Sequence, residues 1–485
     1  MNKPESEDSS AAKAAPRELS ALDPVSQGQA EAERSEFQQS QTKKRALVPR
    51  AALLGVLTGL LAVAFRLALE GIEGVRTASF VRWHSLGWVG LVLCVLWGAL
   101  FSGAGVYLVK QFAPEAGGSG VPHLKGVLMG LQTLRSTRVL LVKFFGGLLA
   151  LGGGLLMGRE GPTLQMGGAM GDLVGRWLRA GESNGRILVA AGAAAGLSAA
   201  FNAPLAGLIF VLEEVQRDFE PAMFAAALVA SLVADVVGRL LVGQESAFRV
   251  TVGAADLRAL PAYLVLGLAC GLLGVAFNRA LMWGSNPDAR WQKWPIGVWA
   301  LAVGALVGVV GFFAPQLLGA GHGLTEATFA QANAPDLWAS AQRLLWLVPL
   351  VLALRFVMTS VSYSTGAAGG FFAPILSLGA QLGLIVALGT HFLAPHLGIH
   401  PQNFAVVGMA ALFAASVRAP LTSIVLIIEM TNGYSLILPL LTACLGAYGV
   451  ADVLGDLPIY EALLERDLAR MGRAHPIPVE VVEAR

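Results

Sequence analysis

The stretch of sequence that decides the fold reads FVMTSVSYSTGAAGGFFAPILSLGAQLGLIVALGTHFLAPHLGIHPQNFAVVGMAALFAASV, from Phe356 to Val417. None of its 62 residues is Asp, Glu, Lys or Arg. A membrane span needs about 20 predominantly apolar residues, so this stretch is long enough for more than one span. It is broken at Gly369-Gly370-Phe371-Phe372-Ala373-Pro374 and at Ala394-Pro395-His396. Helices that begin or end inside a membrane need protein groups or water to satisfy their backbone, and such breaks are typical of a transport pathway.

The composition of the whole chain agrees with this interpretation. Charged residues make up 14% of the 485 residues and hydrophobic residues 55%, whereas a soluble protein carries about 25% charge. There is too little charge to cover a soluble surface, which excludes a soluble enzyme. We therefore expect an all-α polytopic membrane protein. Further apolar spans are predicted over residues 46–75, 85–112, 134–158, 187–212, 221–243, 259–284, 295–318 and 338–361.

The two ends of the chain differ from the middle. Residues 1–42 contain 12 charged residues and a single aromatic one, a composition that predicts a disordered tail. Basic residues precede the first span and follow the last one, so the positive-inside rule places both ends in the cytoplasm and implies an even number of crossings. These residues are Lys43, Lys44, Arg45, Arg50, Arg466, Arg470 and Arg473. We expect a membrane domain over 43–472 and a short cytoplasmic C-terminal tail over 473–485.

An internal repeat connects two distant apolar segments. Residues 194–213, AAGLSAAFNAPLAGLIFVLE, align without gaps on residues 410–429, AALFAASVRAPLTSIVLIIE. Ala-Pro-Leu falls on Ala-Pro-Leu, and Glu213 falls on Glu429. Transporters built from repeats often bind their substrate where the repeats meet, between paired broken helices.

Three Gly- and Pro-rich junctions each begin a helical pattern: GSGVP at 118–122, GREGP at 158–162 and GFFAP at 370–374. A helix N-terminus presents unpaired N–H groups and a partial positive charge, which together attract an anion. Glycine lets the backbone approach a small ligand closely, and a hydroxyl adds a further donor. Such a site would hold an anion loosely enough to release it. The candidate anion-binding residues at the first two junctions are Ser119, Gly120, Arg159 and Gly161.

Glu160 is an ionisable residue inside the second junction, where a charge is costly and usually functional. Its carboxylate would compete with an anion for the same N–H groups, and protonation would release it, so one residue could be both gate and proton acceptor. The alternative is a capping Glu paired with Arg159. Glu213 and Glu214 end another helical pattern, and adjacent helical residues point in different directions. We expect one of them to be structural or solvated and the other to receive protons.

Other candidates carry less information by themselves. Tyr460 begins the last helical pattern and offers a hydroxyl, although a lone Tyr near a membrane interface is more often part of an aromatic belt. Lys143 and Arg355 are intramembrane charges that we interpret as structural partners. The three cysteines lie singly in apolar runs, so neither a disulfide nor a metal site is expected.

The motifs GSGVP, GREGP and GGFFAP, in this order and with Tyr460 near the end, resemble those of the CLC family of chloride channels and proton-coupled chloride transporters. The resemblance implies a homodimer with one pathway per subunit, built from inverted halves of tilted and broken helices at roughly 46–243 and 255–472. It implies that the hydroxyls of Ser119 and Tyr460 and the backbone amides of Phe371 and Phe372 bind chloride.

The same resemblance implies that Glu160 is the external gating glutamate and that Glu214 is the internal proton-transfer glutamate of the exchangers. The pair favours chloride/proton antiport across the cell (inner) membrane, with chloride and protons as partners, no cofactor and no nucleic acid. Ser119, in place of Pro, implies a preference for chloride over nitrate. Two alternatives stay open: a passive voltage- or pH-gated chloride channel of the same fold, and an intramembrane serine protease suggested by GGSG at 117–120. A transporter, not an enzyme, is expected.

Overall fold

The computed structural model describes residues 24–472 except 217–219, 245–246, 249, 254–255, 287 and 398, and it describes residues 24–46 by their backbone only. Within these residues the chain is helical, and the isolated bridge between Gly158 and Gly370 is the one β-type pairing. The first half contains α1 (Pro24–His84), α2 (Trp88–Phe112), α3 (Val121–Leu128), α4 (Ser136–Gly152), α5 (Glu160–Trp177), α6 (Glu182–Phe201), α7 (Pro204–Phe210), a π-helical turn (Val211–Gln216) and α8 (Pro221–Val242).

The second half contains α9 (Leu260–Gly284), α10 (Val298–Phe313), α11 (His322–Ala332), α12 (Leu337–Ser364), α13 (Phe372–Leu393), α14 (Pro401–Val417), α15 (Pro420–Thr431), α16 (Ile437–Val453) and α17 (Ile459–Arg470). Eight of the described helices are long and apolar enough to cross a membrane: α1 from Leu47, α2, α6, α8, α9 with the turn before it, α12, α13 and α16 with the turn before it. The predicted all-α polytopic fold is confirmed.

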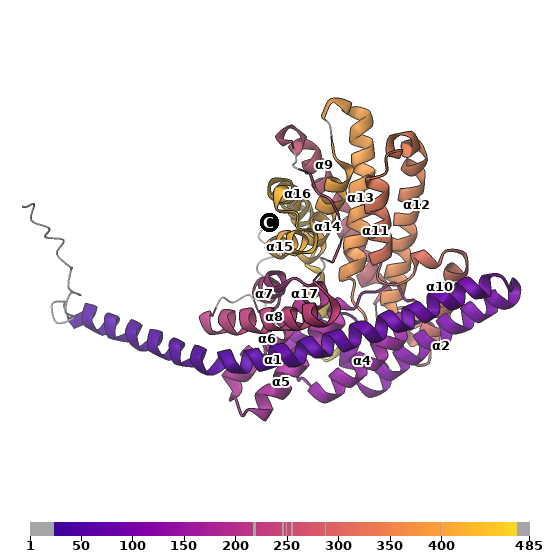
Figure 1. Cartoon of the computed structure of the whole chain (residues 1–485). Helices are drawn as coiled ribbons and strands as arrows, with labels where there is room; N and C mark the ends of the chain where they lie inside the picture. Colours follow the sequence, from indigo (N-terminus) through magenta and orange to yellow (C-terminus); the bar gives the residue numbers. More distant parts are fainter. Residues whose placement is uncertain are drawn as a thin grey trace, which may run out of the picture.

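The prediction of a disordered tail over 1–42 is wrong for residues 24–42, because α1 begins at Pro24. This stretch is rich in Ala, Glu and Gln, which are strong helix formers, and it continues directly into the first span. Figure 1 shows the resulting helix reaching far beyond the rest of the bundle. Residues 1–23 and the predicted tail over 473–485 lie outside the described residues.

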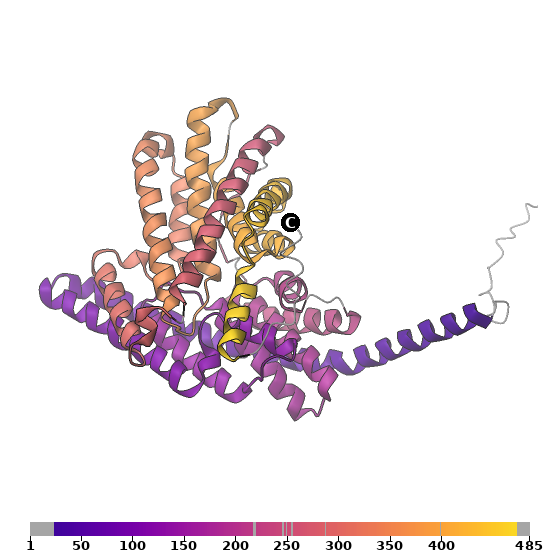
Figure 2. The same cartoon turned by 180° about the vertical axis from the view of Figure 1, so that it is seen from behind.

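The two halves use the same sequence of helix contacts. In the first half α5 packs on α6, α1 packs on α8 and α4 packs on α5, and in the second half α13 packs on α14, α9 on α16 and α12 on α13. The two views in Figures 1 and 2 show the indigo-to-magenta helices gathered on one side of the molecule and the orange-to-yellow helices on the other. Helices α10 and α17 depart from this division, because α10 packs along α2 and α17 contacts α3 (Figure 2).

The aligned segments of the repeat have the same local structure. Asn202 ends α6 and Arg418 ends α14, and both adopt left-handed backbone conformations, with φ of 55° and 67°. Each is followed by the Ala-Pro-Leu that begins the next helix. The break predicted after Phe201 is therefore present in both halves, and the structure confirms the repeat between 194–213 and 410–429.

The repeated glutamates join the halves by a reciprocal exchange. The Glu213 carboxylate accepts hydrogen bonds from the backbone N–H groups of Leu421 (3.1 Å) and Thr422 (2.7 Å), at the start of α15. The Glu429 carboxylate accepts from Leu205 (3.1 Å) and Ala206 (2.8 Å), at the start of α7. Each half thus supplies the acceptors that the first turn of a helix in the other half lacks.

The core of the protein lies around α6 and α14, which are buried along most of their length. These two helices are rich in Ala and Gly, and small residues allow helices to approach closely. The outer helices instead expose large apolar side chains, among them Leu100, Leu240 and Leu350. An apolar exterior around a small-residue core is suited to a lipid environment, where no polar exterior is needed.

Candidate anion and proton pathway

The three junctions predicted from the sequence are helix starts in the structure: α3 begins at Val121, α5 at Glu160 and α13 at Phe372. They meet at Gly161. A Cβ atom placed on Gly161 would lie 2.6 Å from both the carbonyl oxygen and the Oγ of Ser119, and one placed on Gly370 would lie 3.3 Å from the Gly161 nitrogen. The absence of a side chain at Gly161 is what allows the starts of the three helices to converge.

Two backbone hydrogen bonds hold the second and third junctions together. The Gly158 N–H donates to the Gly370 carbonyl at 2.7 Å, and the Gly370 N–H donates to the Gly158 carbonyl at 2.8 Å. These residues precede α5 and α13, so the bonds align the N-termini of corresponding helices from the two halves. Because the first N–H groups of each helix lack intrahelical acceptors, the arrangement concentrates donors at one place.

Two buried hydroxyls lie beside these helix starts. Ser119 and Tyr460 are 1% and 0% exposed, and among the described residues neither the Ser119 Oγ nor the Tyr460 hydroxyl has a hydrogen-bond partner. The Tyr460 ring stacks on Phe371 with a centroid distance of 5.2 Å, at the start of α13. Unsatisfied buried hydroxyls are unusual in a folded protein and indicate a place for a ligand that accepts hydrogen bonds.

The loop that carries Ser119 is held by a buried lysine. Lys143, on α4, donates from its Nζ to the carbonyl oxygens of Ala116 (2.9 Å) and Gly118 (2.7 Å). In the other half Arg355, on α12, donates to the carbonyl oxygens of Leu317 (2.7 Å) and Gly319 (3.0 Å). Both intramembrane cations are therefore structural, as the sequence analysis expected, and their partners are backbone carbonyls.

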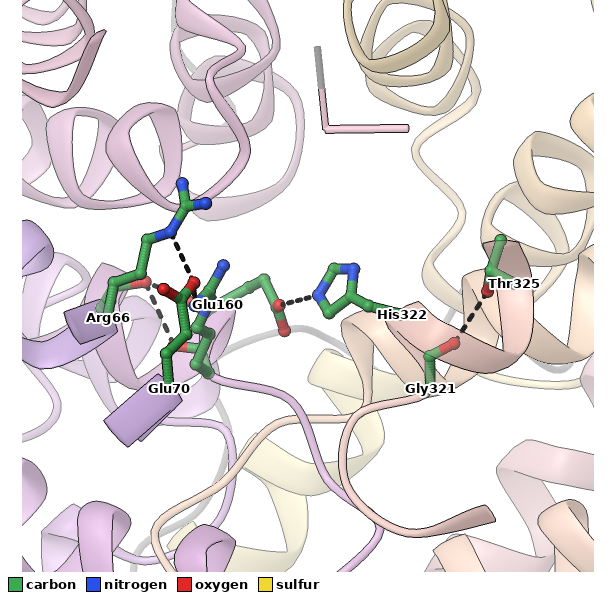
Figure 3. A network of polar contacts seen from close by, with 8 residues as sticks. Arg66, Glu70, Glu160, Gly321, His322 and Thr325 are labelled. Carbon is green, nitrogen blue, oxygen red and sulfur yellow. Dashed lines mark hydrogen bonds and ion pairs between the residues drawn. The ribbon is translucent and has the colours of Figure 1, made fainter. Parts of the chain in front are cut away.

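Glu160 is fully buried, and its contacts are not those of a capping glutamate paired with Arg159. Its Oε1 lies 3.4 Å from the Nε2 of His322, the first residue of α11. A Cβ on Gly158 would lie 2.1 Å from its Oε2, so the carboxylate rests against the backbone of its own junction. Arg159 instead pairs with Glu70 of α1 at 3.1 Å. Figure 3 shows the Glu160 carboxylate facing the His322 ring while Glu70 faces Arg66.

The two adjacent glutamates at the end of α7 separate as predicted. Glu213 is the structural one, bound to the start of α15. Glu214 is 2% exposed, and its carboxylate lies 2.9 Å from the Nζ of Lys125 on α3. The same Nζ lies 2.5 Å from the Glu461 carboxylate, next to Tyr460 on α17. The π-helical turn that carries both glutamates is a geometry often found at functional sites.

A cavity of about 560 Å³ reaches Ser119 from the side on which α17 ends. Lys110, Arg135, Arg466 and Arg470 contribute basic side chains to its wall, while Glu115 and Asp467 contribute acidic ones. Ser119, Gly120 and Tyr363 lie at its wall as well. An excess of basic groups attracts anions into a cleft, so the cavity has the charge expected of an anion entrance.

Sequence reasoning missed three parts of this site. One is a fourth junction, before α11, whose signal was available: PQLLGAG at 315–321 has the same Pro and G-x-G spacing as PEAGGSG at 114–120. The others are the buried partners of Glu214, namely Lys125 and Glu461, and the basic wall of the cavity. Arg466 and Arg470 entered the sequence analysis only as markers of membrane orientation, because nothing in the sequence places them beside Ser119.

Comparisons with known proteins agree with this geometry. The family model of voltage gated chloride channels matches residues 98–452. The H(+)/Cl(-) exchange transporter ClcA of Salmonella arizonae is 39% identical over 432 residues, covering 88% of this chain and 89% of that protein. A crystal structure of a slow cyanobacterial Cl-/H+ antiporter has a TM-score of 0.81 and 35% identity, covering 88% of this chain and 99% of its own.

A eukaryotic CLC transporter structure, at 24% identity and a TM-score of 0.70, has the same fold; it covers 87% of this chain and 74% of its own. The family match extends over most of the membrane domain, and the Salmonella transporter and the cyanobacterial antiporter each cover 88% of this chain. The resemblance seen in the sequence motifs is thereby confirmed. This chain belongs to the CLC, or voltage-gated chloride channel, family.

Proposed function

We propose that this protein is a secondary active transporter that exchanges chloride for protons across the cell (inner) membrane. The observation that carries the proposal is that the two buried hydroxyls of Ser119 and Tyr460 lie at the converging helix starts. Two buried carboxylates adjoin these places in the chain: Glu160 precedes Gly161, and Glu461 follows Tyr460. The names of the relatives, a proton/chloride exchange transporter and a Cl-/H+ antiporter, support the proposal.

In this mechanism chloride enters through the basic cavity and binds at the Ser119 and Tyr460 hydroxyls and the amides of Phe371 and Phe372. The N–H groups at Gly120 and Gly161 add to the positive potential, and Arg159 adjoins them with its charge paired to Glu70. A deprotonated Glu160 is drawn toward the same donors and closes the path, while a protonated Glu160 leaves them to chloride. Glu214 transfers the proton on the inner side. No cofactor is needed, since the movable charges are side chains.

The assembly that we propose is a homodimer with both termini in the cytoplasm and one pathway per subunit. The passive chloride channel is the second candidate, because the same fold and the same anion site would serve it. Glu214 favours antiport, because a buried carboxylate at this place can take up and release a proton, which simple anion conduction does not require. We therefore favour antiport.

The test is transport by purified protein in liposomes. With an outward chloride gradient as the sole driving force, an antiporter moves protons into the liposomes against the proton gradient. A proton ionophore dissipates this proton gradient and should abolish the measured proton accumulation. Chloride flux with no proton movement would establish the channel instead. Liposomes without protein give the leak that both results must exceed.

A further inference from the structure

We propose that His322 relays protons between the outer solution and Glu160. The inference rests on the proposed antiport function and deepens it, because it assigns the outer end of the proton route. The Glu160 and His322 side chains differ in their exposure to solvent. Glu160 is 0% exposed, so it has no direct contact with solution, whereas the His322 side chain is 33% exposed and its Nε2 lies 3.4 Å from the Glu160 Oε1.

The position of His322 is fixed by the fold. It is the first residue of α11, directly after Gly321, whose φ of 99° turns the chain into the helix. Phe248 packs against the imidazole ring with a centroid distance of 5.6 Å. Figure 3 shows His322 approaching Glu160 from a different element and from the opposite side to Arg66 and Glu70. The ring is therefore held between the carboxylate and the exposed surface.

Several charged groups surround the pair. On α1, Glu73 lies 3.9 Å from Arg76 and interacts electrostatically with His322, and Glu70 pairs with Arg159. From α12, Arg355 comes close enough to Gly321 that a Cβ there would lie 2.4 Å from its Nη2. Glu326, one turn along α11, is exposed. His322 reaches both the exposed surface and Glu160, and an imidazole can bind and release a proton at either ring nitrogen, so it is the group suited to pass protons between them.

The transfer is balanced in protons and needs no other reactant. In the starting state the His322 Nε2 carries a hydrogen and faces the ionised Glu160. A proton from water binds Nδ1 and forms imidazolium; the Nε2 proton then passes to the Glu160 Oε1, which leaves a neutral acid and a neutral imidazole with its hydrogen on Nδ1. Loss of that hydrogen to water and uptake of a proton at Nε2 return His322 to its starting tautomer, with Glu160 now protonated. The reverse sequence releases a proton to the outside.

The first experiment compares H322F with wild type and with H396F in liposomes, following chloride and proton fluxes together. His396 is exposed and far along the chain, and it serves as the matched control. We expect H322F to slow coupled transport by about a hundredfold, the lower end of what a positioned acid–base group contributes, and H396F to match wild type. Coupled wild-type transport with an unchanged H322F would overturn the relay but leave antiport standing. A wild type that moves no protons would overturn both.

A second experiment separates proton relay from a structural role. In an E160Q background no proton has to reach residue 160, so adding H322F should leave the remaining chloride flux at the E160Q level. Equal slowing in both backgrounds would show that His322 acts only on structure. Added imidazole should restore transport to H322A, while pyrazole, of the same size but far weaker as a base, should not. Failure of imidazole to restore it would also contradict the relay.

Discussion

The Lys125 Nζ lies 2.9 Å from the Glu214 carboxylate, and both side chains are 2% exposed. A buried cation therefore holds the proposed internal proton-transfer group, and Glu461 lies 2.5 Å from the same Nζ. With all three ionised, the cluster carries one net negative charge. Because Glu461 adjoins Tyr460, the cluster connects the internal carboxylate to the helix that carries an anion-site hydroxyl.

Replacing Lys125 with methionine leaves two carboxylates buried without their cation. Loss of one partner from a buried ion pair costs about 3–5 kcal/mol of the free energy of unfolding, so we expect K125M to unfold at a lower temperature in detergent and to slow proton transport. The double variant K125M/E461Q has the net charge of the wild-type cluster and should recover part of the lost stability. A double variant as unstable as K125M would contradict this charge balance.

Glu214 and Glu213 form a matched pair for testing the inner proton step. E214Q removes the buried carboxylate, so proton movement should stop while chloride still passes. E213Q weakens the acceptor for the start of α15 and should cost about 0.5–2 kcal/mol of stability, as the loss of a helix cap does, with proton coupling retained. Flux measurements in liposomes and thermal unfolding distinguish them. Loss of coupling in both variants would mean that the effect of E214Q is structural.

Glu160 carries the gate and the outer proton site in the proposed mechanism. The E160Q side chain keeps the shape but cannot take up or release a proton. We expect chloride flux that no longer depends on a proton gradient and no proton uptake driven by chloride. Electrode recordings of both ions give the answer directly, and proton pumping that persists in E160Q would remove the residue from both roles.

The proposed role of the Ser119 hydroxyl in anion binding can be tested by the selectivity between nitrate and chloride. S119P deletes a buried hydroxyl that has no partner among the described residues and should raise the preference for nitrate over chloride. The measurement is the ratio of nitrate to chloride flux in the same liposome preparation. An unchanged ratio, in a variant that still transports, would exclude the Ser119 hydroxyl from the selectivity site.

The close approach of Gly161 to Ser119 can be tested by adding a methyl group at position 161. A methyl group there would lie 2.6 Å from the Ser119 Oγ and carbonyl, so G161A should displace the Ser119 loop and lower chloride flux at least about tenfold, since misplacing a binding group has a large effect on rate. Gly71 on α1 has nothing within 4 Å of an added Cβ. G71A should therefore transport normally and gain about 0.5–1 kcal/mol of helix stability. Normal flux in G161A would contradict the close approach.

Local sequence signals predicted much of the fold and part of the candidate site. The charge-free stretches marked the helices, and the Gly and Pro junctions marked where α3, α5 and α13 begin. Because adjacent helical residues point in different directions, only one of Glu213 and Glu214 was predicted to be buried, and the structure confirms it. These are properties of a single segment, where helical geometry or backbone chemistry decides the outcome.

The parts that sequence reasoning missed depend on contacts between distant segments. Glu461 lies 336 residues from Lys125 in the chain, and His322 lies 162 residues from Glu160. No periodicity connects such residues. The helical stretch from Pro24 was missed for another reason: its composition is compatible both with disorder and with an exposed helix, and continuity with the first span favours the helix.

The reciprocal bonds of Glu213 and Glu429 have a consequence for how such a molecule can originate. Each half contains a glutamate that binds the start of a helix in the other half. Each half also contains the helix start to which the other half's glutamate binds. Two copies of a single half would complete each other through the same surface, as subunits do across a two-fold axis. Within this chain the two halves are fastened to each other by equivalent bonds, and the paired starts of α5 and α13 lie on the same boundary between the halves.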